Sequence, residues 1–302
     1  MTSKAAGASD EEVFFELALT DLRRAADLFA SAHEASDGVD GWASLEVSPL
    51  LARDTGATIQ QTKALHAKAG RPNLYIKIPG TPEGLPAIEE CTVLGLPINV
   101  TLLFSAEQYQ RSAQAYLRGI ERRVEAGLNP AVSSVGSVFV SRWDKAVADT
   151  VPHELRDRMG IAVAKQAYRA YRELLDSARW GRLANEGARV QRLLWASTST
   201  KNPEAPELLY VNALTAPLTI NTMPESTLNA FADHGEVGDM MPADGGDADE
   251  TLAAFARAGI DQQSLAVQLQ QEGTEAFERS WKSLLASIAA KHERMTSGSP
   301  SR

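Results

Sequence analysis

The sequence predicts an α/β fold in which one parallel sheet forms a β/α barrel. Segments with strand-like patterns alternate with segments of helical spacing, and this order is typical of a parallel sheet. Successive strands start roughly 25 to 55 residues apart, the length of one crossover unit or of one with an insertion. The chain contains no GxGxxG or GxxxxGK[ST] turn, whereas a doubly wound sheet commonly has a glycine-rich turn after its first strand. We therefore expect a barrel, with its reactive groups towards the carboxyl ends of the strands.

Six strands are expected, each a short apolar run or an apolar–polar alternation bounded by turn residues. They span residues 42–49, 73–81, 96–105, 132–142, 192–198 and 217–224. A closed barrel of this class has eight strands, so the sequence predicts about six of eight and an incomplete barrel.

Helical spacing fills the intervals between the strands and both ends of the chain. The expected helices are 10–32, 55–69, one opening at Pro82, one from the N-cap Ser105 to about 126, 153–184 with a break near Trp180, and 248–295. No linker divides the chain, so residues 1–302 are expected to form one domain, with flexible termini at 1–9 and 296–302.

Composition excludes several classes of function. The chain has 302 residues, 44% of them hydrophobic, and a net charge of −9, so nucleic acid is not an expected partner. Its single cysteine, Cys91, rules out an intrachain disulfide and suits a reducing cytoplasm. No apolar run approaches the ~20 residues of a membrane span, so no membrane partner is expected. The five histidines lack the spacing of a ligand set, and no metal site is predicted.

Lys77 is the most informative residue of the second strand. Leu74, Ile76 and Ile78 are expected on the helix-facing side, which leaves Tyr75 and Lys77 to point into the barrel. Burial disfavours the charged ammonium form, and a neutral amine attacks carbonyl carbon. Lys77 is therefore a candidate Schiff-base nucleophile. The alternative is a lysine that extends to the strand end or pairs with a carboxylate.

The first and third strands add polar groups on the same side. Glu46 is expected to face the lumen, where it either forms a structural ion pair with Lys77 or takes part in proton transfer through a water molecule. Asn99 and Thr101 also face inwards. They fit sugar hydroxyls and a positioned water, or else they form a buried polar pair.

The later strands supply candidates for binding an anion. Ser137 is expected inside the barrel and Arg142 at its rim, where a guanidinium can hold a phosphate through two parallel hydrogen bonds. A solvated surface arginine is the alternative. Lys201 follows the fifth strand, with Ser197 and Thr198 nearby, as a weaker second phosphate candidate. This segment alone favours a solvated loop lysine instead.

Six segments, in this order, resemble those of transaldolase: SLEVSPLLARDT, RPNLYIKIPGTPEGLPAI, INVTLLFSAEQY, SVGSVFVSRWD, LLWASTSTK and LTINTMPESTL. The likeness is closest to the long bacterial type, similar to the transaldolase half of transaldolase/glucose-6-phosphate isomerase fusions. It covers the chain from about Glu11 to about Ile288.

This resemblance implies a (β/α)8 TIM barrel of the class I aldolase type, without metal or other cofactor. It implies a cytoplasmic transferase of the pentose phosphate pathway, monomeric or homodimeric, whose partners are sugar phosphates. The implied reaction moves a dihydroxyacetone unit from sedoheptulose 7-phosphate to glyceraldehyde 3-phosphate, giving erythrose 4-phosphate and fructose 6-phosphate.

The resemblance also assigns roles to single residues. Lys77 matches the Schiff-base lysine, Glu46 the carboxylate that works with a water, and Thr101 the hydroxyl that holds this water. The substrate-binding positions are matched by Asn99, Ser137, Arg142 and Ser197. Lys201 lies near a further phosphate-binding position, with different local spacing.

The chain departs from the family at its front. Family members carry an earlier stretch with two barrel strands, an acid/base aspartate and an asparagine that contacts the intermediate, and nothing before Asp10 matches it. Without that aspartate, turnover is expected to be impaired. The alternative to an active transaldolase is thus a truncated, catalytically impaired sugar-phosphate-binding homologue or fragment. A third hypothesis is a simple aldolase that releases dihydroxyacetone.

Overall fold

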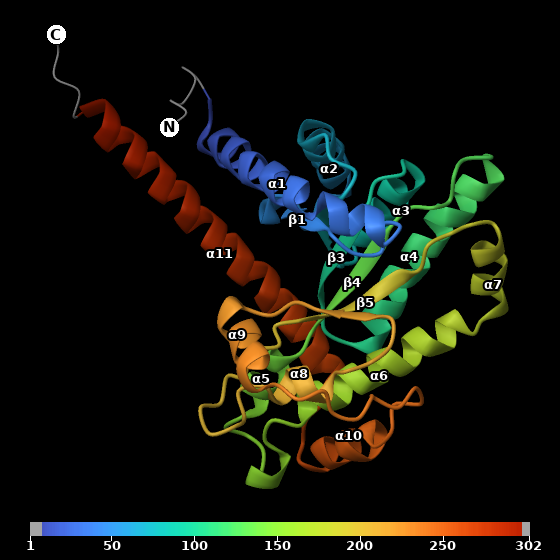
Figure 1. Cartoon of the computed structure of the whole chain (residues 1–302). Helices are drawn as coiled ribbons and strands as arrows, with labels where there is room; N and C mark the ends of the chain where they lie inside the picture. The colour runs from blue at the N-terminus through green and yellow to red at the C-terminus, as the bar shows by residue number, and fades with distance from the viewer. Residues whose placement is uncertain (1–7, 298–302) are drawn as a thin grey trace.

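The computed structural model describes residues 8–297, and each expected strand is present within them (Figure 1). The strands are β1 (Ala43–Glu46), β2 (Leu74–Pro79), β3 (Ile98–Leu103), β4 (Ser134–Phe139), β5 (Gln191–Ala196) and β6 (Thr219–Asn221). All neighbouring pairs are parallel, in the order β1-β2-β3-β4-β5-β6. In the described part β1 and β6 are the two edges of this sheet, so closure into an eight-stranded barrel stays a prediction.

The helices follow the strands in the alternating order that the sequence predicts. They are α1 (Asp10–Ala35), α2 (Thr55–Ala69), α3 (Gly84–Val93), α4 (Ala106–Glu125), α5 (Ser141–Val147), α6 (Met159–Leu175), α7 (Ala178–Asn185), α8 (Leu209–Ala213), α9 (Glu225–His234), α10 (Ala248–Arg257) and α11 (Gln262–Ser297). Two short 3₁₀ turns, η1 (Pro49–Leu51) and η2 (His153–Leu155), complete the described elements.

Several elements differ from the prediction. Helices α5, α8 and α9 are not among those expected, and α5 begins within the expected fourth strand, so that Ser141 and Arg142 are helical. The helix expected from residue 153 begins at Met159, after the short turn η2. The stretch 153–184 breaks at Ser177, whose side chain caps α7, so Trp180 lies inside that helix. The expected helix 248–295 is two helices, α10 and α11, because Gly259 adopts a positive φ of 88° between them. The predicted N-cap Ser105 is confirmed, since its hydroxyl accepts a hydrogen bond from the backbone N–H of Gln108.

The first and last residues lie outside the described part, at 1–7 and 298–302, and the expected flexibility of those segments is untested. Helical order begins at Ser9, which forms a reciprocal capping box with Glu12. In the described part, no helix is long and apolar enough to cross a membrane.

The two faces of the sheet differ in what they bury. Leu74, Ile76 and Ile78 of β2 join the main apolar core with residues of the surrounding helices. Tyr75, on the opposite face, packs in a small inner cluster with Val135 and Leu194. This is the expected division into a helix-facing side and a lumen side, set by the two-residue period of a strand.

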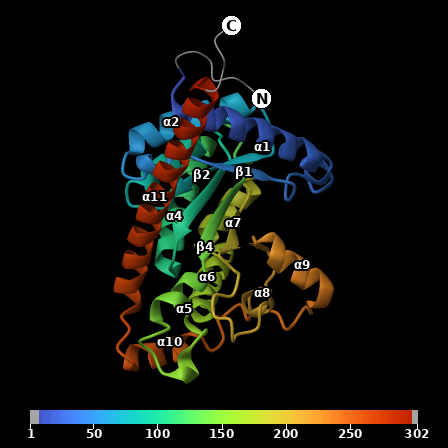
Figure 2. The ribbon, with the colours of Figure 1, turned by 90° about the vertical axis from the view of Figure 1, so that its left-hand side faces the viewer.

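The long helix α11 runs along one side of the molecule, from α10 to the beginning of α1 (Figures 1 and 2). Trp281 of α11 packs edge-on against Phe14 of α1, with 4.7 Å between ring centroids. Further towards its start, Gln270 donates hydrogen bonds to the carbonyl oxygens of Gly80 and Leu102, just beyond Pro79 and Thr101. The helix therefore contacts the carboxyl ends of β2 and β3.

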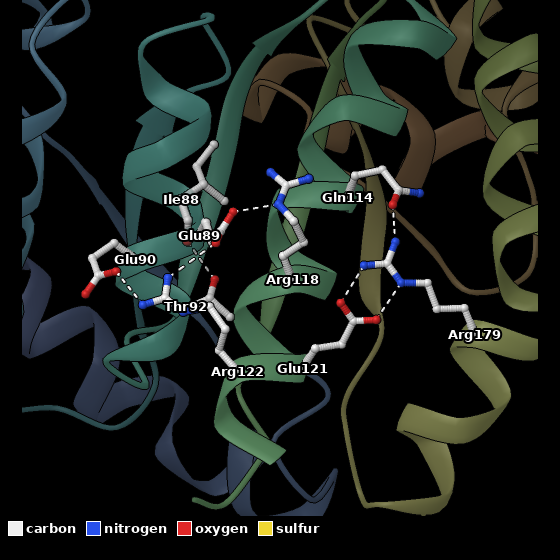
Figure 3. A network of polar contacts seen from close by, with 9 residues as sticks. All are labelled: Ile88, Glu89, Glu90, Thr92, Gln114, Arg118, Glu121, Arg122 and Arg179. Carbon is white, nitrogen blue, oxygen red and sulfur yellow. Dashed lines mark hydrogen bonds and ion pairs between the residues drawn. The ribbon is translucent and has the colours of Figure 1, made fainter. Parts of the chain in front are cut away.

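On the outside of the sheet, ion pairs join α3, α4 and α7 (Figure 3). Nε of Arg118 lies 2.6 Å from Glu89, and Arg179 contacts both carboxylate oxygens of Glu121 at 2.7 Å. Each side chain is partly exposed, so each pair is expected to stabilise the fold by about 1 kcal/mol or less. Their main effect is to fix how the outer helices are aligned.

Asp144 joins three helices behind the end of β4. Its carboxylate accepts hydrogen bonds from the backbone N–H groups of Met159 and Gly160 at the start of α6, and from the hydroxyl of Tyr210 on α8. Because burial outweighs these hydrogen bonds, the pKa of Asp144 is raised to about 6. Asp144 therefore ties α5, which carries Arg142, to α6 and α8.

This raised pKa predicts a pH-dependent contribution to stability. The folded state binds the proton of Asp144 more tightly than the unfolded state, so the contribution is present at low pH and is lost as pH rises through about 6. Asp144→Asn cannot titrate and serves as the reference. Relative to it, the free energy of unfolding of the wild type should rise by about 1.4 kcal/mol when the pH is lowered from 7.5 to 5. Urea unfolding at both pH values measures this difference, and a constant or opposite difference would contradict it.

Candidate active site

A cavity of about 500 Å³ occupies the lumen side of the sheet. Its volume lies within the range of small-molecule sites. Alternate residues of the six strands line it, as the strand period requires. Those on the strands are Ser44, Tyr75, Lys77, Asn99, Thr101, Val135, Ser137, Arg192, Leu194, Ala196 and Ile220. Four residues that the sequence predicted for the site, Lys77, Asn99, Thr101 and Ser137, thus share one cavity.

Lys77 and Glu46 form an ion pair across β1 and β2, whose parallel register places the two residues opposite each other. Nζ of Lys77 lies 3.2 Å from Oε2 of Glu46, and the side chains are 26% and 25% exposed. The expected pairing is confirmed. Full burial of the lysine is not found: its side chain is partly exposed and lies against the carboxylate of Glu46.

Asn99 and Ser137 are held by a chain of hydrogen bonds across the lumen. Oγ of Ser137 donates to the side-chain oxygen of Asn99 at 2.7 Å. The amide nitrogen of Asn99 donates in turn to Oγ of Ser44 at 3.3 Å. Asn99 is paired with Lys77 in the strand register. The amide and both hydroxyls are therefore fixed beside the lysine.

Two buried oxygen atoms near this network make no hydrogen bond within the described part of the chain. They are Oε1 of Glu46 and Oγ1 of Thr101. Thr101 lies one inward position beyond Asn99, is fully buried and lines the cavity. Buried polar atoms almost always have a partner. Each of these two atoms can accept a water molecule or a substrate hydroxyl.

Backbone strain accompanies Thr101. The next residue, Leu102, has a φ of 58° where the pairing of β3 with β4 shifts register. A leucine in this left-handed region costs about 1–2 kcal/mol, and such strain persists only where surrounding contacts impose it. The hydrogen bond from Gln270 to the carbonyl oxygen of Leu102 is one such contact.

Arg142 lies in the first turn of α5, immediately after β4. Its guanidinium is half-buried and makes no hydrogen bond or ion pair with any residue that the structure describes. The guanidinium carbon lies 5.3 Å from the ring centroid of Phe139 and 5.9 Å from that of Phe277. Burial lowers the pKa of this guanidinium from its usual value. A partly dehydrated arginine without a carboxylate partner is available to an anionic ligand.

Ser197 and Lys201, the two candidate binding residues that follow β5, lie in different surroundings. Oγ of Ser197 lies 2.9 Å from Oγ of Ser141, next to Arg142. Lys201 is exposed, contacts Ser199 and lines a different pocket with Asp149 and Asp157. Ser197 is thus adjacent to the predicted site, and Lys201 is not in its cavity.

The structure adds residues to the site to which the sequence assigns no role. Tyr75 is expected to point into the barrel and Ser44 shares the strand face of Glu46, and both line the cavity. Gln270 and Phe277 gave no signal, since α11 approaches the strand ends only through the tertiary fold. No cluster of three or more His, Cys, Asp or Glu side chains suited to a metal ion occurs among the described residues.

Known proteins with similar sequences show the family of this chain. The family model described as Transaldolase/Fructose-6-phosphate aldolase matches residues 2–288. The transaldolase of Acidothermus cellulolyticus is 45% identical over 296 residues, which are 95% of this chain and 80% of that protein. The transaldolase of Mycolicibacterium smegmatis is 46% identical over 93% of this chain and 78% of that protein. For the Thermobifida fusca transaldolase the identity is 45%, over 94% and 79%.

The match to the family model extends through all six strands and the described helices up to the last part of α11. The closer likeness to the fusion type, and the expected lack of an N-terminal part with its aspartate, stay predictions. The chain belongs to the transaldolase/fructose-6-phosphate aldolase family.

Proposed function

We propose that this chain is a transaldolase of the pentose phosphate pathway. It moves a dihydroxyacetone unit from sedoheptulose 7-phosphate to glyceraldehyde 3-phosphate, and releases erythrose 4-phosphate and fructose 6-phosphate. The observation that carries this proposal is Lys77, which lines one cavity with Asn99, Thr101 and Ser137 and is paired with Glu46. Relatives named transaldolase, at 45–46% identity, favour a transferase over a binding protein without catalysis.

The reaction starts when Lys77 gives up a proton to Glu46, 3.2 Å away, and its free amine attacks the C2 carbonyl of the ketose. Loss of water from this adduct forms an iminium. The bond between C3 and C4 then breaks, its electron pair moves into the iminium to give an enamine, and the C4 hydroxyl passes its proton, through the water held by Glu46 and Thr101, to the carboxylate of Glu46 as the first aldehyde leaves. Attack of the enamine on the second aldehyde reverses these steps, and water finally releases the product and regenerates the amine.

The remaining residues of the site fit the same sequence of steps. Glu46 and Thr101 hold the water that carries protons, because each has a buried oxygen free to bond it. Asn99 and Ser137 contact the hydroxyls of the three-carbon unit, and Arg142 binds the phosphate at the far end of the donor, with Ser197 beside it. No cofactor is needed in this mechanism, since the iminium itself accepts the electron pair.

Trapping of the intermediate tests this proposal. Borohydride reduction after addition of fructose 6-phosphate should leave a covalent adduct on the peptide that contains Lys77, detected by mass spectrometry. The full chain should also release erythrose 4-phosphate from sedoheptulose 7-phosphate when glyceraldehyde 3-phosphate is present. A folded sample that yields no adduct and no turnover would rule out the proposal.

A second candidate is cleavage without transfer, because the matching family model also covers fructose-6-phosphate aldolase. The two activities differ in the fate of the enamine, which is either protonated or captured by an aldehyde. The amount of free dihydroxyacetone compared with transfer product, measured with and without acceptor aldehyde, separates them.

A further inference from the structure

One face of α11 is directed at Arg142 and at the strand ends beside it. Gln270, Gly273, Thr274 and Phe277 have the spacing i, i+3, i+4, i+7 of a single helix face. Gln270 bonds the carbonyl oxygens of Gly80 and Leu102 at 3.1 and 2.9 Å. These bonds fix the position of α11 along β2 and β3, and with it the position of Phe277.

The same face brings the helix backbone close to the arginine. A Cβ atom added to Gly273 would lie 3.0 Å from Cδ2 of Leu102 and 3.6 Å from Nη1 of Arg142. Glycine at this point thus lets α11 approach the guanidinium, even though glycine weakens a helix interior. One turn later the ring of Phe277 lies 5.9 Å from the guanidinium carbon.

A buried charge is usually paired with an opposite charge, but the half-buried guanidinium of Arg142 has the ring of Phe277 beside it. An aromatic face attracts a guanidinium without using its N–H groups. A carboxylate would occupy those donors and oppose the binding of a second anion. The ring of Phe139 acts on the same guanidinium from β4 and stacks on Phe104, with 5.2 Å between centroids.

We infer that Phe277 of α11 is a positioning residue for Arg142, and that it gives the site its preference for phosphorylated donors. This inference rests on the proposed function for its substrate. It adds to that function a residue from the C-terminal helix, which acts on the phosphate end of the donor and not on the reacting carbon.

The main test compares a phosphorylated donor with its unphosphorylated form. Phe277→Leu should raise the KM for fructose 6-phosphate about fivefold, with kcat within about twofold of wild type, while kcat/KM for fructose stays unchanged. Phe277→Tyr keeps the ring and should restore the wild-type values. Equal losses for both donors in Phe277→Leu would overturn the inference.

Phe255→Leu is the matched control for loss of packing. Phe255 is buried in the apolar cluster against which Phe277 packs, and no ring contact joins it to Arg142 among the described residues. It should lower the melting temperature without changing the preference between the two donors. If Phe255→Leu changes this preference as much as Phe277→Leu does, the specific role of Phe277 is wrong.

A double-mutant cycle tests whether Phe277 acts through Arg142. In an Arg142→Ala background, Phe277→Leu should have no further effect on the ratio of kcat/KM for fructose 6-phosphate to that for fructose. Independent, additive effects of the two substitutions would contradict the inference.

Inorganic phosphate supplies a readout that needs no turnover. Phosphate should raise the melting temperature of the wild type above that in chloride of equal ionic strength, Phe277→Leu should reduce this increase, and Arg142→Ala should abolish it. If the wild type shows the phosphate effect but no transfer, the proposed function fails and the positioning role stands. A phosphate effect unchanged in Phe277→Leu overturns the positioning role.

Discussion

Replacing Lys77 with methionine should abolish the borohydride-trapped adduct and lower the rate of transfer by at least about a thousandfold. Methionine has a similar length but no amine, so no iminium can form to accept the electrons of the broken carbon–carbon bond. The change also leaves Glu46 without its partner at 3.2 Å. Because both side chains are only about a quarter exposed, leaving Glu46 without its partner should lower stability by about 1–3 kcal/mol, and the variant should still fold. Activity, adduct mass and circular dichroism together check the prediction.

Lys68→Met is the matched control for Lys77→Met. Lys68 also pairs with a glutamate, with its Nζ atom 3.5 Å from Glu16, but on the exposed surface between α2 and α1. It should keep wild-type turnover and the full yield of adduct on Lys77. An adduct that forms on another lysine in Lys77→Met, with transfer retained, would show that the nucleophile has been wrongly identified.

The strands and their inward residues could be predicted because both depend on local pattern. The two-residue period in 73–81 places Ile76 and Ile78 on the helix side and Lys77 on the lumen side, and the structure confirms this division. Parallel register then brings Glu46, Lys77 and Asn99 to one level of the sheet.

The features that local pattern does not predict depend on contacts between distant segments. The loop after β5 carries Lys201 away from the cavity, since Ser197 adopts a φ of 57° and Asn202 bonds the carboxylate of Asp157 at 2.7 Å. Helix α5 is only seven residues long and is anchored by Asp144, whose partners lie on α6 and α8. A seven-residue helix is too short to show a periodic pattern in the sequence. The direction of a loop depends on contacts with other segments, and these contacts leave no periodic pattern either.

The contact of Arg142 with Phe277 is the clearest case of a site feature that local sequence pattern cannot predict. The sequence indicates an arginine at the rim, but its environment comes from a helix 135 positions further along the chain. Helical spacing predicts that Phe277 lies on an apolar face. It cannot predict that this face meets a guanidinium at the end of β4.

Replacing Glu46 with glutamine should lower the rate of transfer by about a hundredfold while the adduct on Lys77 still forms, more slowly. Glutamine keeps the size of the side chain and can still bond Lys77, but it cannot accept the amine proton or return it to the leaving hydroxyl. If Glu46 served only as a structural partner of Lys77, the substitution would lower stability and leave the rate nearly unchanged. Single-turnover measurement of adduct formation, together with steady-state transfer, distinguishes these two roles.

Glu89→Gln separates the loss of a buried charge from the loss of a proton acceptor. Glu89 is 22% exposed and pairs with Arg118 and Arg122 on the outer helices, so its burial resembles that of Glu46. Both variants should lose a similar amount of stability, and only Glu46→Gln should lose transfer.

Thr101→Val should lower the rate of transfer, as Glu46→Gln does, because it removes the other buried oxygen available to the same water. Thr101→Ser should keep most of the rate. If Thr101→Val is as active as Thr101→Ser, the proton path does not include this hydroxyl, and Glu46 must exchange protons directly with substrate.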